Sequence, residues 1–210
     1  MGNRLEVVED GLITEYAVNE MNQYATVGGE PYQYDADGNL VDANDGEGTY
    51  RFNPENRLIG ASTAEGHFSY GYDALGQRTL VNRAGDRVLQ VIDPSGLGTV
   101  VGEYDPTSGS LRTRHTYGHG LLETSSPAGE SSYYTFGTVG STSELLTSEA
   151  SVRASYGYSP FGIVFAGSSH EATAFQFVGQ WGVTNEGNGL HSMRARFFQA
   201  GLGRFISEDP

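Results

Sequence analysis

The segment Tyr70-Gly-Tyr72-Asp-Ala-Leu-Gly-Gln-Arg78 carries the pattern that decides the fold, because three upstream segments align with it. These are Tyr16-Ala-Val18-Asn-Glu-Met-Asn-Gln-Tyr24, Tyr32-Gln-Tyr34-Asp-Ala-Asp-Gly-Asn-Leu40 and Tyr50-Arg-Phe52-Asn-Pro-Glu-Asn-Arg-Leu58. All four share tyrosine, a second aromatic or aliphatic residue two positions later, Asp or Asn, and turn-prone residues with Asn or Gly. Their third positions, 18, 34, 52 and 72, lie 16, 18 and 20 residues apart, so the chain contains an irregular internal repeat.

Each repeat is typical of a strand, a turn and a second strand. In Tyr-x-Tyr the two rings lie on one face of a strand, because side chains alternate with a period of two. The Asp or Asn that follows favours an Asx turn, and the glycine can adopt a positive φ. A single hairpin is only marginally stable, so we expect successive units to continue one antiparallel sheet and to bury their aromatic rings.

Composition supports the same fold class. The chain has 210 residues, of which 30 are glycine and 13 are tyrosine, while only 37% are hydrophobic. These values favour many short strands and turns, so we expect an all-β protein. No apolar stretch approaches the roughly 20 residues that span a bilayer, so no membrane insertion is expected, and no secretory signal is visible at the N-terminus.

The charge restricts the partners. The net charge is −14, from 26 acidic and 12 basic residues, so a polyanion such as nucleic acid is not an expected partner. The absence of cysteine excludes disulfides and thiolate metal sites, and it leaves the redox compartment open. His115 and His119 are four residues apart, but the Tyr117-Gly-His-Gly120 stretch favours a strand and turn over a helical metal site. We expect no metal and no cofactor.

The four repeats resemble YD repeats, which are named for the Tyr-Asp pair found here at Tyr34-Asp35 and Tyr72-Asp73, with Tyr104-Asp105 as a further candidate. In the RHS/YD-repeat family, such repeats form a large hollow β-shell. Members include the C components of bacterial toxin complexes, RHS polymorphic toxins and animal teneurins. The resemblance therefore implies consecutive antiparallel β-hairpins that form part of a coiled shell.

Later segments resemble the RHS repeat-associated core domain, which is expected to close the shell. They are Tyr133-Tyr-Thr-Phe-Gly-Thr-Val-Gly-Ser141, Leu145-Leu-Thr147, Tyr156-Gly-Tyr-Ser-Pro-Phe-Gly162, Phe175-Gln-Phe-Val-Gly-Gln-Trp181 and Gly189-Leu-His-Ser-Met-Arg-Ala-Arg196. Gly137 stands where the family usually has an aspartate. We expect YD repeats over residues 1–115 and the core domain over residues 116–210.

The chain ends in Arg194-Ala-Arg-Phe-Phe-Gln-Ala-Gly-Leu-Gly-Arg-Phe-Ile-Ser-Glu-Asp-Pro210, which resembles the end of that core domain. In members that process themselves, the core domain is an aspartic-type autoprotease that releases a C-terminal polypeptide. The resemblance implies that Asp209 is the catalytic acid and that Arg196 orients or tunes the carboxylates. Aspartic chemistry needs two carboxylates that share a proton, and the family's second acid and scissile bond would lie beyond Pro210. This chain alone is therefore not expected to cleave itself.

Two functions follow from the resemblance. The first is the C-terminal part of a secreted or cell-surface shell that encloses and releases its own C-terminal effector polypeptide, with upstream shell or delivery proteins as further partners. The second is a cell-surface adhesion or carbohydrate-binding module. Aromatic rings that face an interior would favour the shell, whereas exposed rings would favour glycan binding.

Overall fold

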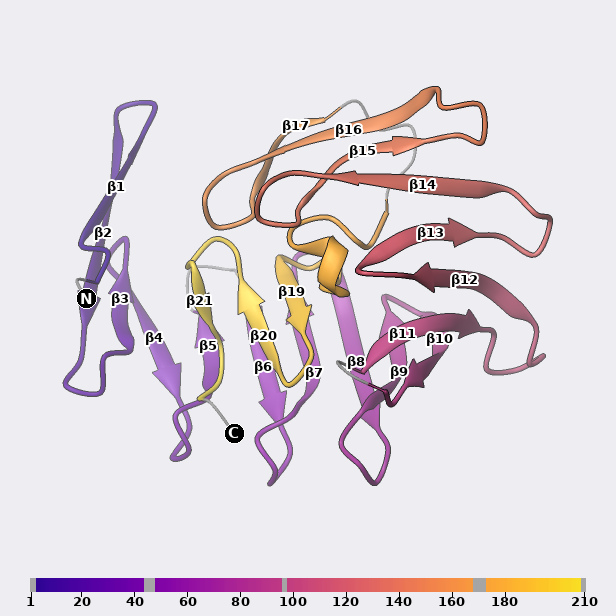
Figure 1. Ribbon diagram of the computed structural model, residues 1–210. Helices are drawn as coiled ribbons and strands as arrows, with labels where there is room; N and C mark the ends of the chain where they lie inside the picture. The colour runs from indigo at the N-terminus through magenta and orange to yellow at the C-terminus, as the bar shows by residue number, and fades with distance from the viewer. Residues whose placement is uncertain (1–2, 44–47, 96–97, 168–172, 209–210) are drawn as a thin grey trace.

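The computed structural model describes residues 3–43, 48–95, 98–167 and 173–208, and these residues form two antiparallel sheets (Figure 1). The large sheet has 17 strands and the small sheet has four. Their only helical element within the described ranges is one 3-10 turn, η1 (Gly179–Trp181). None of the described residues forms a helix long and apolar enough to cross a membrane.

The strands of the large sheet follow one another along the chain. They are β1 (Glu6–Glu9), β2 (Leu12–Val18), β3 (Tyr24–Val27), β4 (Glu30–Tyr34), β5 (Leu40–Ala43), β6 (Gly48–Phe52), β7 (Leu58–Thr63), β8 (Gly66–Tyr72), β9 (Arg78–Arg83), β10 (Asp86–Asp93), β11 (Thr99–Tyr104), β12 (Leu111–Tyr117), β13 (Leu121–Ser125), β14 (Ser131–Phe136), β15 (Thr142–Leu146), β16 (Val152–Tyr158) and β17 (Val164–Gly167). The small sheet contains β18 (Thr184–Asn185), β19 (Leu190–Met193), β20 (Arg196–Gln199) and β21 (Arg204–Phe205).

The large sheet is a meander that curves into an arc. Each strand pairs with the next one in the chain, from β1 with β2 to β16 with β17. Figure 1 shows the arc running from β1 through β8 and returning above through β14 to β17, with the small sheet inside it. The predicted all-β fold of consecutive hairpins is confirmed, although β1 and β17 are the two ends of the described meander and the sheet is not closed into a barrel.

One turn geometry follows the first strand in each of the four repeats. At Asp73 the carboxylate Oδ1 accepts the backbone N–H groups of Leu75 and Gln77, both at 2.9 Å. The Asp73 N–H donates to the Gln77 carbonyl, and Gly76 has a φ of 79°. The same arrangement follows Asn19, Asp35 and Asn53, with positive φ values at Asn22, Gly38 and Asn56. The predicted Asx turns are therefore confirmed.

The same turn continues where the sequence pattern has faded. Five-residue turns with the same backbone hydrogen bonds begin at Ser126, Gly137, Thr147 and Ser159. Ser126, Thr147 and Ser159 supply a hydroxyl where the repeats have Asp or Asn, whereas Gly137 supplies no side chain at all. The hairpin repeat thus runs through the predicted boundary at 115/116, which falls inside β12, and the division into two domains remains a prediction.

The repeat aromatics are buried on one face of the sheet, as the alternation predicts. Tyr32, Tyr50 and Tyr70 are 6%, 2% and 5% exposed, and they belong to one hydrophobic cluster with Leu40 and Leu58. The small sheet covers this face: Leu190, Phe197, Leu202 and Ile206 complete the cluster. A backbone hydrogen bond of 2.8 Å from the Leu40 N–H to the Ile206 carbonyl ties the covering segment to β5.

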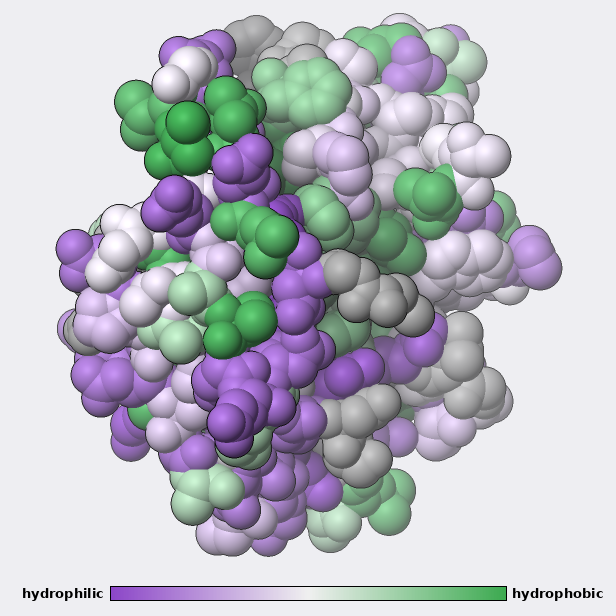
Figure 2. All heavy atoms as spheres, turned by 90° about the vertical axis from the view of Figure 1, so that its left-hand side faces the viewer, coloured by the Kyte–Doolittle hydropathy of each residue, from purple (hydrophilic) through white to green (hydrophobic). Residues whose placement is uncertain are grey.

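The first hairpin of the meander is less well covered. Val8, Leu12 and Ile13 of the β1–β2 hairpin are 59%, 75% and 61% exposed. Figure 2 shows hydrophobic residues gathered at the upper end of the face that corresponds to the left side of Figure 1, where this hairpin projects. An apolar edge of this kind marks a place where further protein can pack.

The turn geometry predicts two opposite changes in stability. Asp73→Ala removes the acceptor for two backbone N–H groups, so we expect it to lower the free energy of unfolding by about 1 kcal/mol. Gly137 has no left-handed φ, and an added Cβ would meet only the Ser141 carbonyl at 3.8 Å. Gly137→Asn should therefore supply the missing acceptor and raise the free energy of unfolding by roughly 0.5–1 kcal/mol. Chemical denaturation of both variants tests this; destabilisation by Gly137→Asn would contradict it.

Candidate functional site

The structure describes one of the two predicted catalytic residues. Arg196 begins β20, is half-buried, and places its guanidinium over the ring of Phe205 at 3.8 Å. Asp209 lies outside the described residues. The assignment of both residues to a self-cleavage site therefore stays a prediction.

Arg196 lies in a groove of about 400 Å³ beside the turn at 35–39. Arg204 lines the same groove, stacks on Tyr24 at 4.1 Å, and donates to the Asn3 Oδ1 at 2.6 Å. Burial raises the pKa of Tyr34, at the groove wall, to about 12, although the charge of Arg204 opposes the rise. Two arginines thus line the same groove as Ser207 and Glu208 of the segment that leads to Asp209, and their positive charge favours the ionised form of a carboxyl group nearby.

Glu208 marks the contact between this segment and the repeat turn. Its side chain packs against Gly38 so closely that a Cβ added there would lie 2.9 Å from the Glu208 Cγ. Gly38 also has a φ of 83°, so the turn needs glycine for both its backbone conformation and this contact. The groove is therefore built jointly by a repeat turn and the C-terminal segment.

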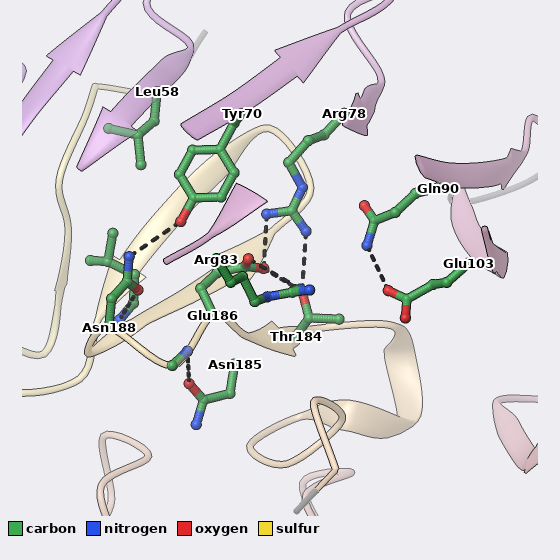
Figure 3. Close-up of polar contacts among 12 residues, drawn as sticks. Leu58, Tyr70, Arg78, Arg83, Gln90, Glu103, Thr184, Asn185, Glu186 and Asn188 are labelled. Carbon is green, nitrogen blue, oxygen red and sulfur yellow. Dashed lines mark hydrogen bonds and ion pairs between the residues drawn. The ribbon is translucent and has the colours of Figure 1, made fainter. Parts of the chain in front are cut away.

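A second polar cluster is buried between the two sheets, and the sequence reasoning missed it (Figure 3). Glu186, which follows β18, is fully buried and pairs with Arg78 of β9 at 2.8 Å and with Arg83 at 3.3 Å. Thr184 donates its hydroxyl to Glu186 and accepts from Arg78. Beside these groups, Asn188 donates to the Tyr70 hydroxyl at 3.2 Å.

The ion pair keeps both partners charged. Burial alone would raise the pKa of Glu186, but the nearby charges of Arg78 and Arg83 outweigh burial and hold it below its ordinary value of 4.5. Burial also opposes the charge of Arg78, but Glu186 outweighs it and the pKa of Arg78 rises. The cluster therefore joins the small sheet to β9 through a buried ion pair between Glu186 and Arg78, with the partly exposed Arg83 beside it.

One signal in the repeats could have located this cluster. Arg78 ends the fourth repeat, at the position where the second and third repeats have Leu40 and Leu58. Both leucines are 1% exposed, so the repeat places this position in the core. An arginine there needs a buried anion, and the tertiary structure supplies Glu186, which lies 108 residues further along the chain.

The buried cluster predicts a large effect from a small change. Glu186→Gln keeps the shape of the side chain but leaves two guanidinium groups without their anion, so we expect a loss of roughly 3–5 kcal/mol in the free energy of unfolding. The double change Arg78→Leu with Glu186→Leu removes both charges of the buried pair. It should lower the free energy of unfolding by less than the sum of the losses caused by Arg78→Leu alone and Glu186→Leu alone. A double-mutant cycle from denaturation curves measures this coupling; simple additivity would contradict it.

The lowered pKa of Glu186 also predicts a pH dependence. Because the folded pKa lies below 4.5, the stabilisation is present above that pH and is lost as the pH falls below it. The difference in free energy of unfolding between the wild-type chain and Glu186→Gln should therefore narrow in acid. Denaturation curves at several pH values test this, and a constant difference would show that the pKa of Glu186 is the same in the folded and unfolded chains.

Crystal structures of a toxin complex share the fold. The similarity to TcdB2-TccC3-Cdc42 has a TM-score of 0.74 at 16% identity and covers 95% of this chain and 11% of that chain. For TcdB2-TccC3-TEV the TM-score is 0.72 at 17% identity, with the same coverage. For TcdB2-TccC3 without its hypervariable C-terminal region, the TM-score is 0.67 at 15% identity. The similarity again covers 95% of this chain and 11% of that chain.

Identity at this level establishes the fold alone, and the chain spans only about a tenth of the length of those proteins. Comparison with curated protein sequences gives no match. The profile of the Teneurin YD-shell family, however, matches residues 2–210. The expected membership of the RHS/YD-repeat proteins is thereby confirmed: the chain belongs to the Teneurin YD-shell family.

Proposed function

We propose that this chain is the C-terminal part of a secreted or cell-surface RHS/YD-repeat shell that encloses a C-terminal effector polypeptide and releases it. The observation that supports the proposal best is the burial of the repeat aromatics beneath β19, β20 and the segment after them. The covering segment returns from the far end of the meander and lies inside the arc. A polypeptide continuing from Glu208 would thus begin beside the covered face.

The inner position of the C-terminal segment suits a container. A closed shell, of which this curved sheet would form a part, can keep an enclosed polypeptide away from solvent and from other proteins, because closure leaves no strand edge unpaired. Among the similar structures, one is of TcdB2-TccC3 without its hypervariable C-terminal region, so that protein has a C-terminal region that can be absent. An effector in the corresponding place is our proposal for this chain.

Upstream shell protein is the further partner that we propose. The exposed apolar side chains of the β1–β2 hairpin lie at the first edge of the meander, where an additional antiparallel strand could pair. Covering Val8, Leu12 and Ile13 would remove apolar surface from water. Delivery proteins would act on the assembled shell and not on this chain alone.

The adhesion alternative receives less support. It requires exposed aromatic rings in the repeats, but Tyr24, Tyr32, Tyr50 and Tyr70 are each at most 6% exposed, and exposed rings such as Phe165 lie outside the four repeats. Rings in these positions stabilise the sheet by packing and are not available to stack on a sugar. A glycan array tests the alternative: specific binding by this chain would favour adhesion over the container.

For processing, we propose that Asp209 is one acid of an aspartic-type pair and that Arg196 holds the carboxylates in their reactive arrangement. Two carboxylates at close range share one proton, and the ionised one can then activate a water molecule. The positive groove formed by Arg196 and Arg204 would favour the ionised form. The second acid and the bond to be cut would come from sequence downstream of Pro210.

The test uses a longer protein that includes the downstream sequence. On a denaturing gel we expect the wild-type protein to appear as two fragments and Asp209→Asn as one uncut chain. Glu65→Gln is the matched control, because it removes an exposed carboxylate in the turn between β7 and β8, which does not line the groove, and it should be cut like wild type. Cleavage of Asp209→Asn would overturn the assignment of Asp209.

Arg196 requires a separate readout because it also stacks on Phe205. We expect Arg196→Gln to slow cleavage by at least tenfold, since loss of a charged hydrogen-bonding partner costs about 1.5–3 kcal/mol. The rate of cleavage should be measured beside the unfolding midpoint. Slower cleavage with an equal loss of stability would indicate a structural role only.

A further inference from the structure

A second cavity lies on the inner face of the large sheet, away from the predicted cleavage site. It has a volume of about 230 Å³, its floor is formed by β11 to β15, and Thr173, Ala174 and Phe175 cover it. We call it the His115 cavity. His115, which the sequence pattern indicated to be an ordinary histidine, lines it and is only 6% exposed.

A chain of hydrogen bonds fixes one side of the His115 ring. The ring nitrogen Nδ1 lies 3.2 Å from the Thr124 hydroxyl, which lies 2.9 Å from the Tyr134 hydroxyl, which in turn lies 2.8 Å from the Thr173 hydroxyl. The other ring nitrogen, Nε2, is buried and has no hydrogen-bond partner. When Nδ1 donates to Thr124, Nε2 carries a lone pair and acts as an acceptor.

The cavity also contains the carboxylate of Glu103. Its Oε1 accepts a hydrogen bond of 3.1 Å from the side chain of Gln90 (Figure 3). The Gln90 side-chain oxygen is itself buried without a partner. Burial lowers the pKa of His115, with Glu103 opposing the shift, so the ring is neutral at neutral pH and does not balance the carboxylate.

The cavity therefore offers two acceptors, the Glu103 carboxylate and, in this tautomer, Nε2 of His115, beside an aromatic wall. No arginine is among the described residues that line it; Arg153 donates to the hydroxyl of Ser132, at its margin, at 3.1 Å. Phe175 packs edge-on against His115, with ring centroids 4.8 Å apart. A planar cation with several N–H donors and no acceptor satisfies such a surface best, and guanidinium has this chemistry.

We propose that the His115 cavity binds a guanidinium group, which donates to the Glu103 carboxylate and to Nε2 of His115. The group could belong to an arginine of a polypeptide held against the inner face or to a small free molecule. The site does not depend on the proposed container role. It uses neither Arg196 nor Asp209.

The test is a titration of the ¹⁵N-histidine-labelled chain, followed through the imidazole nitrogens of His115 by NMR. One arm uses methylguanidinium against neutral methylurea, and the other uses a Gly-Ser peptide with one arginine against the same peptide with citrulline. We expect saturable shifts with the cationic member of at least one pair and none with the neutral members. A response to the arginine peptide alone would identify a polypeptide as the source of the guanidinium group, and a response to methylguanidinium alone would identify a small free molecule.

Two variants complete the test. Glu103→Gln should weaken cation binding at least about tenfold because it removes the charged acceptor. Glu144→Gln is the matched control, since Glu144 lies on the opposite face of the sheet. This variant should bind the cationic probe with the same affinity as the wild-type chain. The proposal is overturned if neither cation gives a saturable shift, if the neutral probes bind equally well, or if both variants bind like wild type.

Discussion

The paired aromatic rings of the second, third and fourth repeats point to the same face of the sheet, and that face has to be covered. Alternation along a strand makes this unavoidable, because Tyr-x-Tyr places both rings on one side. The cover comes from Leu190, Phe197 and Ile206, which belong to the last part of the chain. The position of the C-terminal segment inside the arc, and of the groove at Arg196, follows from this requirement.

Burial of apolar surface alone does not set the register of the covering segment. The ion pair between Arg78 and Glu186 does so, because a buried charge is tolerated only where its partner meets it. The polar contacts of Thr184 and Asn188 add direction to the same interface. The polar cluster thus orients β18 to β20 on the face that carries the repeat tyrosines, whereas the buried hydrophobic residues provide the packing between the two sheets.

The sequence was sufficient to predict the local structure of the repeats. Asp35 and Asp73 are adjacent to the backbone groups that they bond, so the turn can be inferred from a few neighbouring residues. The turns at 126, 137, 147 and 159 were not recognised, because Ser, Thr and Gly do not mark the position as Asp does. The backbone repeat persists after its side-chain signature has been lost.

The site was less predictable, since its parts come from distant segments. Arg78 and Glu186 are 108 residues apart, and neither belongs to a motif that specifies the other. Arg196 was selected by family resemblance, and the structure places it in a groove with Arg204 and Glu208. Asp209 lies outside the described residues, so its role still rests on that resemblance.

Native-state hydrogen exchange at Leu40 tests the central claim, that the C-terminal segment covers the aromatic face, most directly. The Leu40 amide donates to the Ile206 carbonyl across the two sheets. If the cover is intact, this amide should be strongly protected and should exchange together with the amides of β19 and β20. Fast exchange at Leu40 while the amides of β7 and β8 remain protected would contradict the account.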